Sequence, residues 1–213
     1  MIKPLSGQRK EYLISSLDEK SLDADPLKQF SKWFGDALNA GIDEPNAMVL
    51  STSDLNGNVS ARVVLLKGIE DKGFVFFTNY DSRKGRQISS NPRAALTFLW
   101  YPMERQVRVE GKVVKVSRKE SEAYFGNRPA DSQLSACISP QSCVIPDRAF
   151  LESMREGLLR DLDGAQPACP GNWGGYLLRP TLVEFWQGRA HRLHDRIQYR
   201  RSGSKWVVER LAP

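Results

Sequence analysis

The fold is decided by residues 47–79, which read AMVLSTSDLNGNVSARVVLLKGIEDKGFVFFTN. This segment holds three short runs rich in β-branched and aromatic residues, at 47–53, 59–67 and 73–79. The turn-forming stretches DLNGN and EDKG separate them, and each contains the glycine that tight hairpins favour. Strands this short and this closely spaced favour an antiparallel barrel or sandwich over a parallel sheet.

The rest of the chain adds helices and strands around this segment. Asp25 has the side chain of a helix cap and Pro26 suits the first helical position, and apolar residues then recur at helical spacing until Gly41. Further helices are expected at 118–127 and 146–161, and further strands at 94–101, 105–116, 182–187, 197–201 and 206–210. These elements predict an α+β chain that forms a single domain over residues 1–213.

Composition excludes several classes of protein. A chain of 213 residues with 40% hydrophobic content can bury a sizeable core. It holds no apolar run of about 18 residues, so no membrane-spanning helix is expected. The first residues, MIKPLSGQRKEY, lack the apolar core of a secretory signal, which predicts a cytoplasmic protein. Two histidines and three cysteines without CxxC spacing (Cys137, Cys143 and Cys169) predict neither a disulfide framework nor a metal centre.

The positive charge indicates an anionic partner. A net charge of +6 and a pI of about 9.3 admit nucleic acid, an anionic membrane surface or a phosphorylated small molecule. The cations are scattered singly or in pairs between apolar strand residues, whereas nucleic-acid-binding arms are usually contiguous basic runs. Scattered cations that converge in the fold suit discrete phosphates better than a polyanion.

The segment Ser82-Arg83-Lys84-Gly85-Arg86 combines a helix start with the densest group of cations. Ser82 has the side chain of a helix cap, so free backbone N–H groups would lie beside Arg83 and Lys84. A helix N-terminus with two cations makes a good phosphate site. The alternative is a solvated basic loop.

Two other groups could also meet anions. The run RVVLLK at 62–67 has a cation at each end, and their opposite parity on an ideal strand means that either a bulge intervenes or they serve different groups. Tyr124, Arg128 and Ser132 recur at four-residue spacing, but Pro129 argues against one continuous helix. We expect the helix to end before this proline, and a bend that brings the three together around an anion.

Residues 184–196, EFWQGRAHRLHDR, place Arg192, His194 and Arg196 at every second position. On one extended strand the three side chains would project from the same face and repel one another unless an anion or an electron-rich ring lies against them. Trp186 adds an aromatic surface to the same element. This combination favours a binding site over a solvated strand face.

These motifs, taken in order, resemble the pyridoxine/pyridoxamine 5′-phosphate oxidases, a family that uses FMN. The resemblance extends from Arg9 to Pro213 and rests on nine blocks: RVVLLK, FFTN with SRKGRQI, ERQVRVEG, YFGNRPADSQ, ISPQS, WGGY, EFWQG, RLHDR and ERLAP. It implies an antiparallel split β-barrel of the FMN-binding type with flanking helices, and a homodimer with FMN at the subunit interface. It also implies that residues 1–22 form a flexible lid.

The resemblance assigns roles residue by residue. It implies FMN contacts from Arg62, Val63, Val64, Leu65, Leu66, Lys67, Phe77, Thr78, Arg83, Lys84, Gln106, Gln141, Ser142, Trp186 and Arg196. It implies substrate contacts from Arg9, Lys10, Glu11, Tyr12, Lys67, Tyr124, Arg128, Ser132, Arg192, Leu193 and His194. Arg192 and His194, against the substrate ring, are the candidates for catalysis; a structural role for His194 is the alternative.

The implied reaction is the oxidation of pyridoxine 5′-phosphate and pyridoxamine 5′-phosphate to pyridoxal 5′-phosphate, in which a hydride passes to the flavin and O2 is reduced to H2O2. Two alternatives remain open. One is a related split-barrel flavin oxidoreductase with a different substrate, and the other is a non-catalytic, basic nucleic-acid-binding barrel.

Overall fold

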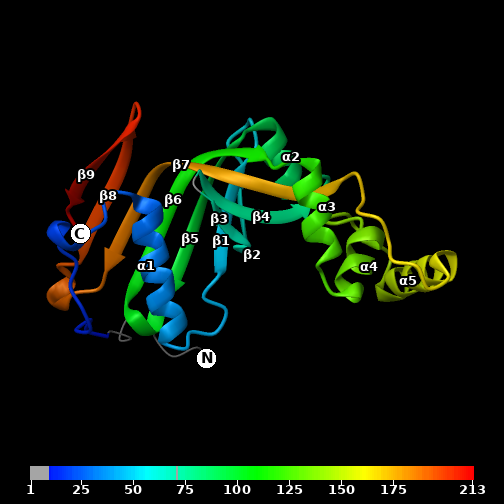
Figure 1. Ribbon diagram of the computed structural model, residues 1–213, viewed down its shortest axis with the longest axis horizontal. Helices are drawn as coiled ribbons and strands as arrows, with labels where there is room; N and C mark the ends of the chain where they lie inside the picture. Colours follow the sequence, from blue (N-terminus) through cyan, green and yellow to red (C-terminus); the bar gives the residue numbers. More distant parts are fainter. Residues whose placement is uncertain (1–9, 71) are drawn as a thin grey trace, which may run out of the picture. The chain divides into compact units, whose positions relative to one another are not determined.

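The structure is a computed structural model that describes residues 10–70 and 72–213, so the expected substrate contact Arg9 lies outside the described residues. Figure 1 shows the order of the elements. The α-helices are α1 (Pro26–Asn39), α2 (Arg83–Ser90), α3 (Arg118–Gly126), α4 (Ala130–Ile138) and α5 (Arg148–Leu162). The strands are β1 (Ala47–Ser53), β2 (Val59–Leu65), β3 (Gly68–Glu70), β4 (Gly73–Asn79), β5 (Arg93–Trp100), β6 (Arg105–Lys115), β7 (Trp173–Gln187), β8 (Asp195–Ser202) and β9 (Lys205–Leu211).

The strands form one sheet in the order β2-β1-β5-β6-β7-β4-β3, and β8 and β9 continue it from β7. The pairs β3–β4, β4–β7, β7–β8 and β8–β9 are antiparallel. The predicted α+β class with an antiparallel sheet is therefore confirmed. The sequence missed the short strand β3 and the helix α4, and it placed the start of β7 at residue 182 instead of 173.

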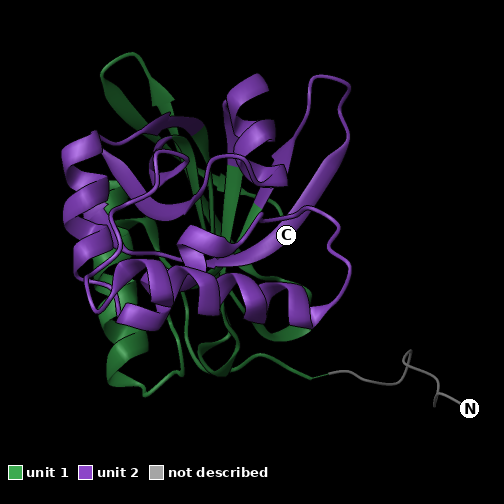
Figure 2. Ribbon diagram, turned by 90° about the vertical axis from the view of Figure 1, so that its right-hand side faces the viewer, with its two compact units in different colours: residues 1–50, 95–111, 180–213 green, residues 51–94, 112–179 purple. Residues whose placement is uncertain are grey.

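The chain divides into two compact units, coloured in Figure 2. Unit 1 comprises residues 1–50, 95–111 and 180–213, and unit 2 comprises residues 51–94 and 112–179. Each unit has buried aromatic side chains of its own.

Helix α1 covers the core of unit 1. Asp25 caps it as predicted, because its side chain accepts a hydrogen bond from the N–H of Leu27 at 2.9 Å, and Pro26 is the first helical residue. Phe30 packs edge-on against Phe98, with ring centroids 4.8 Å apart, and Trp33 packs against Phe185 at 5.1 Å. The aromatic face of the helix is thus core packing.

Helix α2 lies in unit 2, where the sequence predicted a capped helix start. Ser82 is fully buried, and its hydroxyl accepts a hydrogen bond from the N–H of Gly85 at 3.2 Å. A Cβ atom on Gly85 would lie 2.1 Å from the carbonyl oxygen of Tyr80. The close approach of these two backbone segments therefore requires glycine at position 85.

We expect Gly85→Ala to lower the free energy of unfolding by about 1–3 kcal/mol, the usual cost of overpacking, because the backbone must shift to admit the methyl group. Gly35 in α1 is the matched control, since nothing lies within 4 Å of its added Cβ. Gly35→Ala should raise the free energy of unfolding by about 0.5–1 kcal/mol, the helix preference for alanine. Urea titration of both variants measures the difference, and equal effects would contradict the packing at Gly85.

Candidate active site

The candidate site begins with a cavity of about 460 Å³ in unit 2, here called the unit 2 pocket. Its lining consists of Arg62, Val63, Val64, Leu65, Lys67, Phe77, Thr78, Lys84, Tyr124, Arg128, Pro129, Ser132, Gln141 and Trp173. The sequence predicted all of these as site residues except Pro129 and Trp173. The lining holds four cations and no carboxylate, so the cavity suits an anionic ligand.

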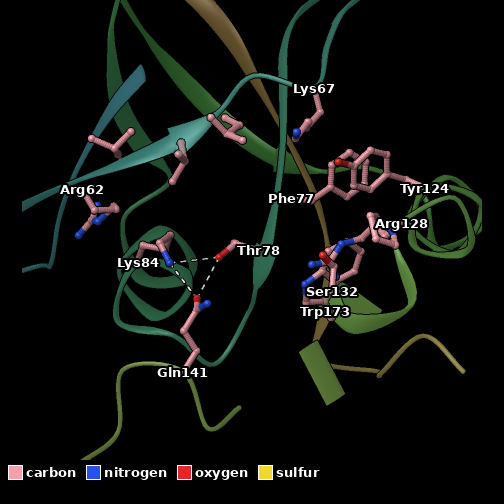
Figure 3. Close-up of a pocket in the computed structure, with 14 residues that line it drawn as sticks. Arg62, Lys67, Phe77, Thr78, Lys84, Tyr124, Arg128, Ser132, Gln141 and Trp173 are labelled. Atoms are coloured by element: carbon pink, nitrogen blue, oxygen red, sulfur yellow. Dashed lines mark hydrogen bonds between the residues drawn. The ribbon is translucent and has the colours of Figure 1, made fainter. Parts of the chain in front are cut away.

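One group of polar side chains gathers around Lys84. Its ammonium donates to the amide oxygen of Gln141 at 2.8 Å and to the hydroxyl of Thr78 at 3.2 Å, as the dashed lines in Figure 3 show. Burial, and then the charge of Arg62, lowers the pKa of Lys84 to about 8. A half-buried ammonium beside a guanidinium is a poor arrangement by itself, and a bound dianion would relieve it. This group therefore fits a phosphate.

The structure answers the question that the parity of Arg62 and Lys67 left open. Strand β2 ends at Leu65, so Lys67 belongs to the link before β3, where its N–H donates to the carbonyl of Val75 at 2.8 Å. The alternation of side chains between the two faces of a strand therefore does not apply to Lys67. Both cations line the same cavity because the strand ends between them.

A second group lies on the other side of the cavity in Figure 3, where Arg128, Ser132 and Trp173 are drawn. Helix α3 ends at Gly126, and Pro129 precedes α4, so the predicted bend is confirmed and Tyr124, Arg128 and Ser132 line one cavity. The three residues fit an anion because two carry hydroxyl groups and one a guanidinium.

Arg128 has a donor that nothing in the described residues satisfies. Its guanidinium lies over the ring of Trp173, 4.6 Å from the centroid, and its Nη1 atom is buried without a hydrogen-bond partner among those residues. Burial lowers the pKa of Arg128. A buried, unpaired donor is costly, so a phosphate oxygen at this point would stabilise the side chain.

A second cavity, of about 600 Å³, lies in unit 1 and is here called the unit 1 pocket. Its lining consists of Lys10, Glu11, Tyr12, Arg189, His191, Arg192 and His194. The sequence predicted these residues except Arg189 and His191, which lie inside the quoted run EFWQGRAHRLHDR. The N-terminal residues and the predicted catalytic pair therefore meet in one cavity.

The predicted column of cations from Arg192 to Arg196 on one strand was wrong. Strand β7 ends at Gln187, a single 3-10 turn spans Ala190–Arg192, and β8 begins only at Asp195. His191 and Arg192 have left-handed backbone angles, φ 57° and φ 61°. The chain must reverse here because β7 and β8 pair antiparallel, and alternation does not apply across a reversal.

Arg196 and Trp186 lie outside both cavities, on the paired strands β8 and β7. Arg196 donates to the buried carboxylate of Glu184 at 2.8 Å and to the carbonyl of Ala212 at 2.9 Å. The ring of Trp186 lies 4.6 Å from the ring of His194 and 5.7 Å from that of Tyr12. Trp186 thus borders the unit 1 pocket, while Arg196 already has partners within its own unit.

The remaining predicted site residues do not line either cavity. Leu66 is buried, Gln106 is half-buried on β6, Arg83 is exposed at the start of α2, Ser142 is exposed with φ 72°, and Leu193 is 68% exposed. Their roles stay predictions.

The environment of His194 fixes where its proton lies. The backbone N–H of Arg189 donates to Nδ1 of His194 at 3.1 Å, so this nitrogen is an acceptor and the neutral ring carries its proton on Nε2. Burial, and then the charge of Arg192, lowers the pKa of His194. The ring therefore offers an N–H donor at neutral pH.

We expect His194 to titrate below 6.5, its ordinary pKa, because protonation at lower pH would turn the accepting Nδ1 into a second donor that faces the Arg189 N–H. Arg192→Gln should raise the titration midpoint of His194, because it removes the nearby positive charge. Arg200→Gln should leave this midpoint unchanged, because the Arg200 guanidinium pairs with Glu209 on β9. Proton NMR of the ring resonances against pH measures all three. A parental midpoint at or above 6.5 that is insensitive to Arg192 would contradict this electrostatic description.

Neither a metal group nor a membrane span emerges from the described part of the chain. Its His, Cys, Asp and Glu side chains form no cluster that could hold a metal ion. Among the described helices, none is long and apolar enough to cross a bilayer.

Comparison with known proteins gives concordant matches along the chain. Residues 34–157 match the family model described as pyridoxamine 5′-phosphate oxidase, and residues 173–213 match the pyridoxine 5′-phosphate oxidase C-terminal dimerisation region. A pyridoxine/pyridoxamine 5′-phosphate oxidase of Cupriavidus necator is 53% identical over 98% of this chain and 99% of its own. The enzyme of the same name from Pseudomonas paraeruginosa is 49% identical over the full length of both chains.

Solved structures agree on the fold. PhzG from Burkholderia lata, crystallised with tetrahydrophenazine-1-carboxylic acid, is 29% identical with a TM-score of 0.88 and covers 94% of this chain and 99% of its own. A pyridoxamine 5′-phosphate oxidase-related, FMN-binding protein from Nostoc punctiforme has a TM-score of 0.71 at 18% identity and covers 90% and 100%.

The fold and the matches define an oxidoreductase with the split-barrel fold. Within that class, the chain belongs to the pyridoxine/pyridoxamine 5′-phosphate oxidase family. The alternative of a non-catalytic nucleic-acid-binding barrel is therefore wrong, because the full-length relatives are named as enzymes.

Proposed function

We propose that the protein is an FMN-dependent oxidase that converts pyridoxine 5′-phosphate and pyridoxamine 5′-phosphate to pyridoxal 5′-phosphate. The observation that supports this proposal is the unit 2 pocket, where two groups of cationic and polar side chains lie in one cavity whose lining has no carboxylate. Two groups suit two phosphates, one on the cofactor and one on the substrate.

Arg62 and Lys84 are the proposed ligands of the FMN phosphate. The lowered pKa of Lys84 and the charge of Arg62 beside it fit a dianion, which would favour the protonated ammonium. Thr78 and Gln141 already share the Lys84 ammonium and would orient it. When bound, FMN would accept a hydride from the substrate and pass the electrons to O2, giving H2O2.

The substrate phosphate is assigned to Lys67, Tyr124, Arg128 and Ser132. The unpartnered Nη1 of Arg128 supports this assignment, since the phosphate would supply the missing acceptor. Arg192 would lie against the substrate ring, and His194 would donate its Nε2–H to a polar group of the substrate. These residues would bind and orient the substrate so that its reacting carbon lies near the flavin.

A homodimer is proposed because residues 173–213 match the dimerisation region of the family. FMN at the subunit interface, a lid formed by the N-terminal residues and a cytoplasmic location stay predictions.

A related reaction on another reduced substrate is the second candidate, and the similarity to PhzG favours it. The two candidates differ in whether the substrate carries a phosphate. The cluster of Tyr124, Arg128 and Ser132 supports the phosphorylated vitamers.

Anaerobic mixing tests the proposal. Pyridoxamine 5′-phosphate should bleach the flavin absorbance of the FMN-loaded protein, whereas unphosphorylated pyridoxamine should bleach it far more slowly. Equal rates for both compounds would favour the second candidate.

We expect Arg192→Lys to lose much of its turnover and to retain FMN. Lysine keeps the charge but loses the planar guanidinium that stacks on an aromatic face. Steady-state kinetics and the flavin content of the purified variant measure the two effects. If turnover and substrate affinity both equal those of the parent, Arg192 does not contact the ring.

A further inference from the structure

Glu104 is a buried carboxylate next to the unit 1 pocket that does not line it. The residue is 3% exposed, lies just before β6 and has a left-handed backbone with φ 56°. We propose that Glu104 is a positioning residue that holds the two walls of the unit 1 pocket together. The proposal rests on the function proposed above, because it assigns those walls to the substrate.

The first wall is the N-terminal segment, residues 10–16. The Oε2 atom of Glu104 accepts a hydrogen bond from the backbone N–H of Ile14 at 3.1 Å, and its Oε1 atom lies 3.4 Å from the ammonium of Lys10. Tyr12 lies between these two attachment points in the sequence. One carboxylate therefore fixes the segment on both sides of Tyr12.

The second wall is the loop that follows β7 and carries Arg192 and His194. The backbone carbonyl of Glu104 accepts from the N–H of Gly188 at 2.8 Å and from the side-chain amide of Gln187 at 3.2 Å. Glu104 thus holds the start of this loop with its main chain while its side chain holds the N-terminal segment.

The two walls touch at Gly188. A Cβ atom at this position would lie 2.7 Å from Cγ of Tyr12 and 3.0 Å from Cβ of Glu104. The ring of Tyr12 can pack there, at 5.7 Å from both the Trp186 and His194 rings, because position 188 has no side chain. The placement of Tyr12 in the pocket depends on contacts that Glu104 anchors.

The surroundings of the Glu104 side chain suit a charged group. The Glu104 side chain is 1% exposed, and a carboxylate so deeply buried needs a cation and hydrogen-bond donors around it. Lys10 is the cation and Ile14 is a donor. A second attachment lies farther along the segment, where the N–H of Leu17 donates to the carboxylate of Asp195 at 3.0 Å, so loss of Glu104 would release the segment only before residue 17.

Hydrogen exchange of the FMN-loaded protein tests the proposal directly. In Glu104→Ala the Ile14 amide should exchange roughly tenfold faster or more, the scale for a lost hydrogen bond to a charged group, while the Leu17 amide is unchanged. Glu104→Gln keeps an acceptor oxygen for Ile14 but loses the charge, so it should accelerate exchange less. Glu209→Ala, which removes a surface carboxylate paired with Arg200, is the matched control and should change neither amide.

Kinetics supply the second readout. Glu104→Ala should raise the KM for pyridoxamine 5′-phosphate while its flavin content stays at the parental level, because only the substrate walls loosen. Glu104→Gln keeps the size of the side chain but loses the ion pair with Lys10, and it should raise the KM in the same direction even if Glu104→Ala does not fold.

Parental exchange at Ile14 in Glu104→Gln and Glu104→Ala, or parental KM values in Glu104→Ala and Glu104→Gln, would overturn the proposal. Exchange is measured without turnover, so its outcome is independent of the reaction. If the parental protein forms no aldehyde, the proposed function is refuted. Faster exchange of the Ile14 amide in Glu104→Ala would still confirm that Glu104 holds the N-terminal segment.

Discussion

Lys84→Ala and Arg62→Ala should each weaken FMN binding by about 1.5–3 kcal/mol, which is roughly 10- to 150-fold in the dissociation constant. Both cations line the unit 2 pocket, whose lining contains no carboxylate. Loss of either would remove a charge-assisted bond to the FMN phosphate. Quenching of FMN fluorescence by the apoprotein measures the dissociation constant across a salt titration.

Arg86→Ala is the matched control for these variants. Arg86 belongs to the same helix, but its guanidinium donates to the backbone carbonyl of Asp81 and does not line the pocket. Arg83→Ala should weaken FMN binding by less than Lys84→Ala does and by more than Arg86→Ala does, since Arg83 is exposed at the helix start. Equal FMN affinity in Lys84→Ala, Arg62→Ala and Arg86→Ala would contradict the phosphate assignment.

FMN binding should also weaken above about pH 8. Burial and Arg62 lower the pKa of Lys84 to about 8 in the protein without ligand, and the phosphate favours the charged ammonium. Affinity is therefore full below this pKa and falls as the pH rises through it. Lys84→Ala should lose this dependence, which the same fluorescence titration would show.

Arg128→Ala should raise the KM for pyridoxamine 5′-phosphate by roughly 10- to 150-fold, with kcat close to the parental value. The phosphate is remote from the reacting carbon and is bound alike in the ground state and the transition state. The buried Nη1 atom without a partner among the described residues indicates that Arg128 is arranged for a ligand and not for a structural ion pair.

Arg148→Ala is the control for Arg128→Ala, because Arg148 is an exposed arginine that pairs with Glu152 on α5. It should leave both kinetic constants unchanged. If Arg128→Ala discriminates between pyridoxamine and its phosphate as strongly as the parent does, Arg128 does not hold the phosphate.

Local patterns were sufficient for much of the fold. Strand bounds at 47–53 and 73–79 were predicted from runs of β-branched and aromatic residues and the turns beside them, and Asp25-Pro26 marked the start of α1 correctly. The sequence did not reveal α4, because it begins directly after Pro129, which was interpreted only as the bend that follows α3.

The site was predictable only where its residues are close in sequence or belong to the family motifs. Trp173 stands in the quoted block WGGY but was given no role, because only the fold shows that it lies under the Arg128 guanidinium. Arg189 and His191 stood in the quoted run, but the assumption of a continuous strand hid the reversal that places them in the pocket. Glu104 begins the quoted block ERQVRVEG but was given no role, since its burial and its hydrogen bonds to residues 14 and 188 are properties of the folded chain alone.

The most direct measurement is aerobic turnover of the purified, FMN-loaded protein with each phosphorylated vitamer. We predict formation of pyridoxal 5′-phosphate from pyridoxamine 5′-phosphate and from pyridoxine 5′-phosphate, with one O2 consumed and one H2O2 released per aldehyde. The unphosphorylated vitamers should react far less efficiently. Absence of aldehyde from both phosphorylated substrates, in protein that retains its flavin, would contradict the proposed function.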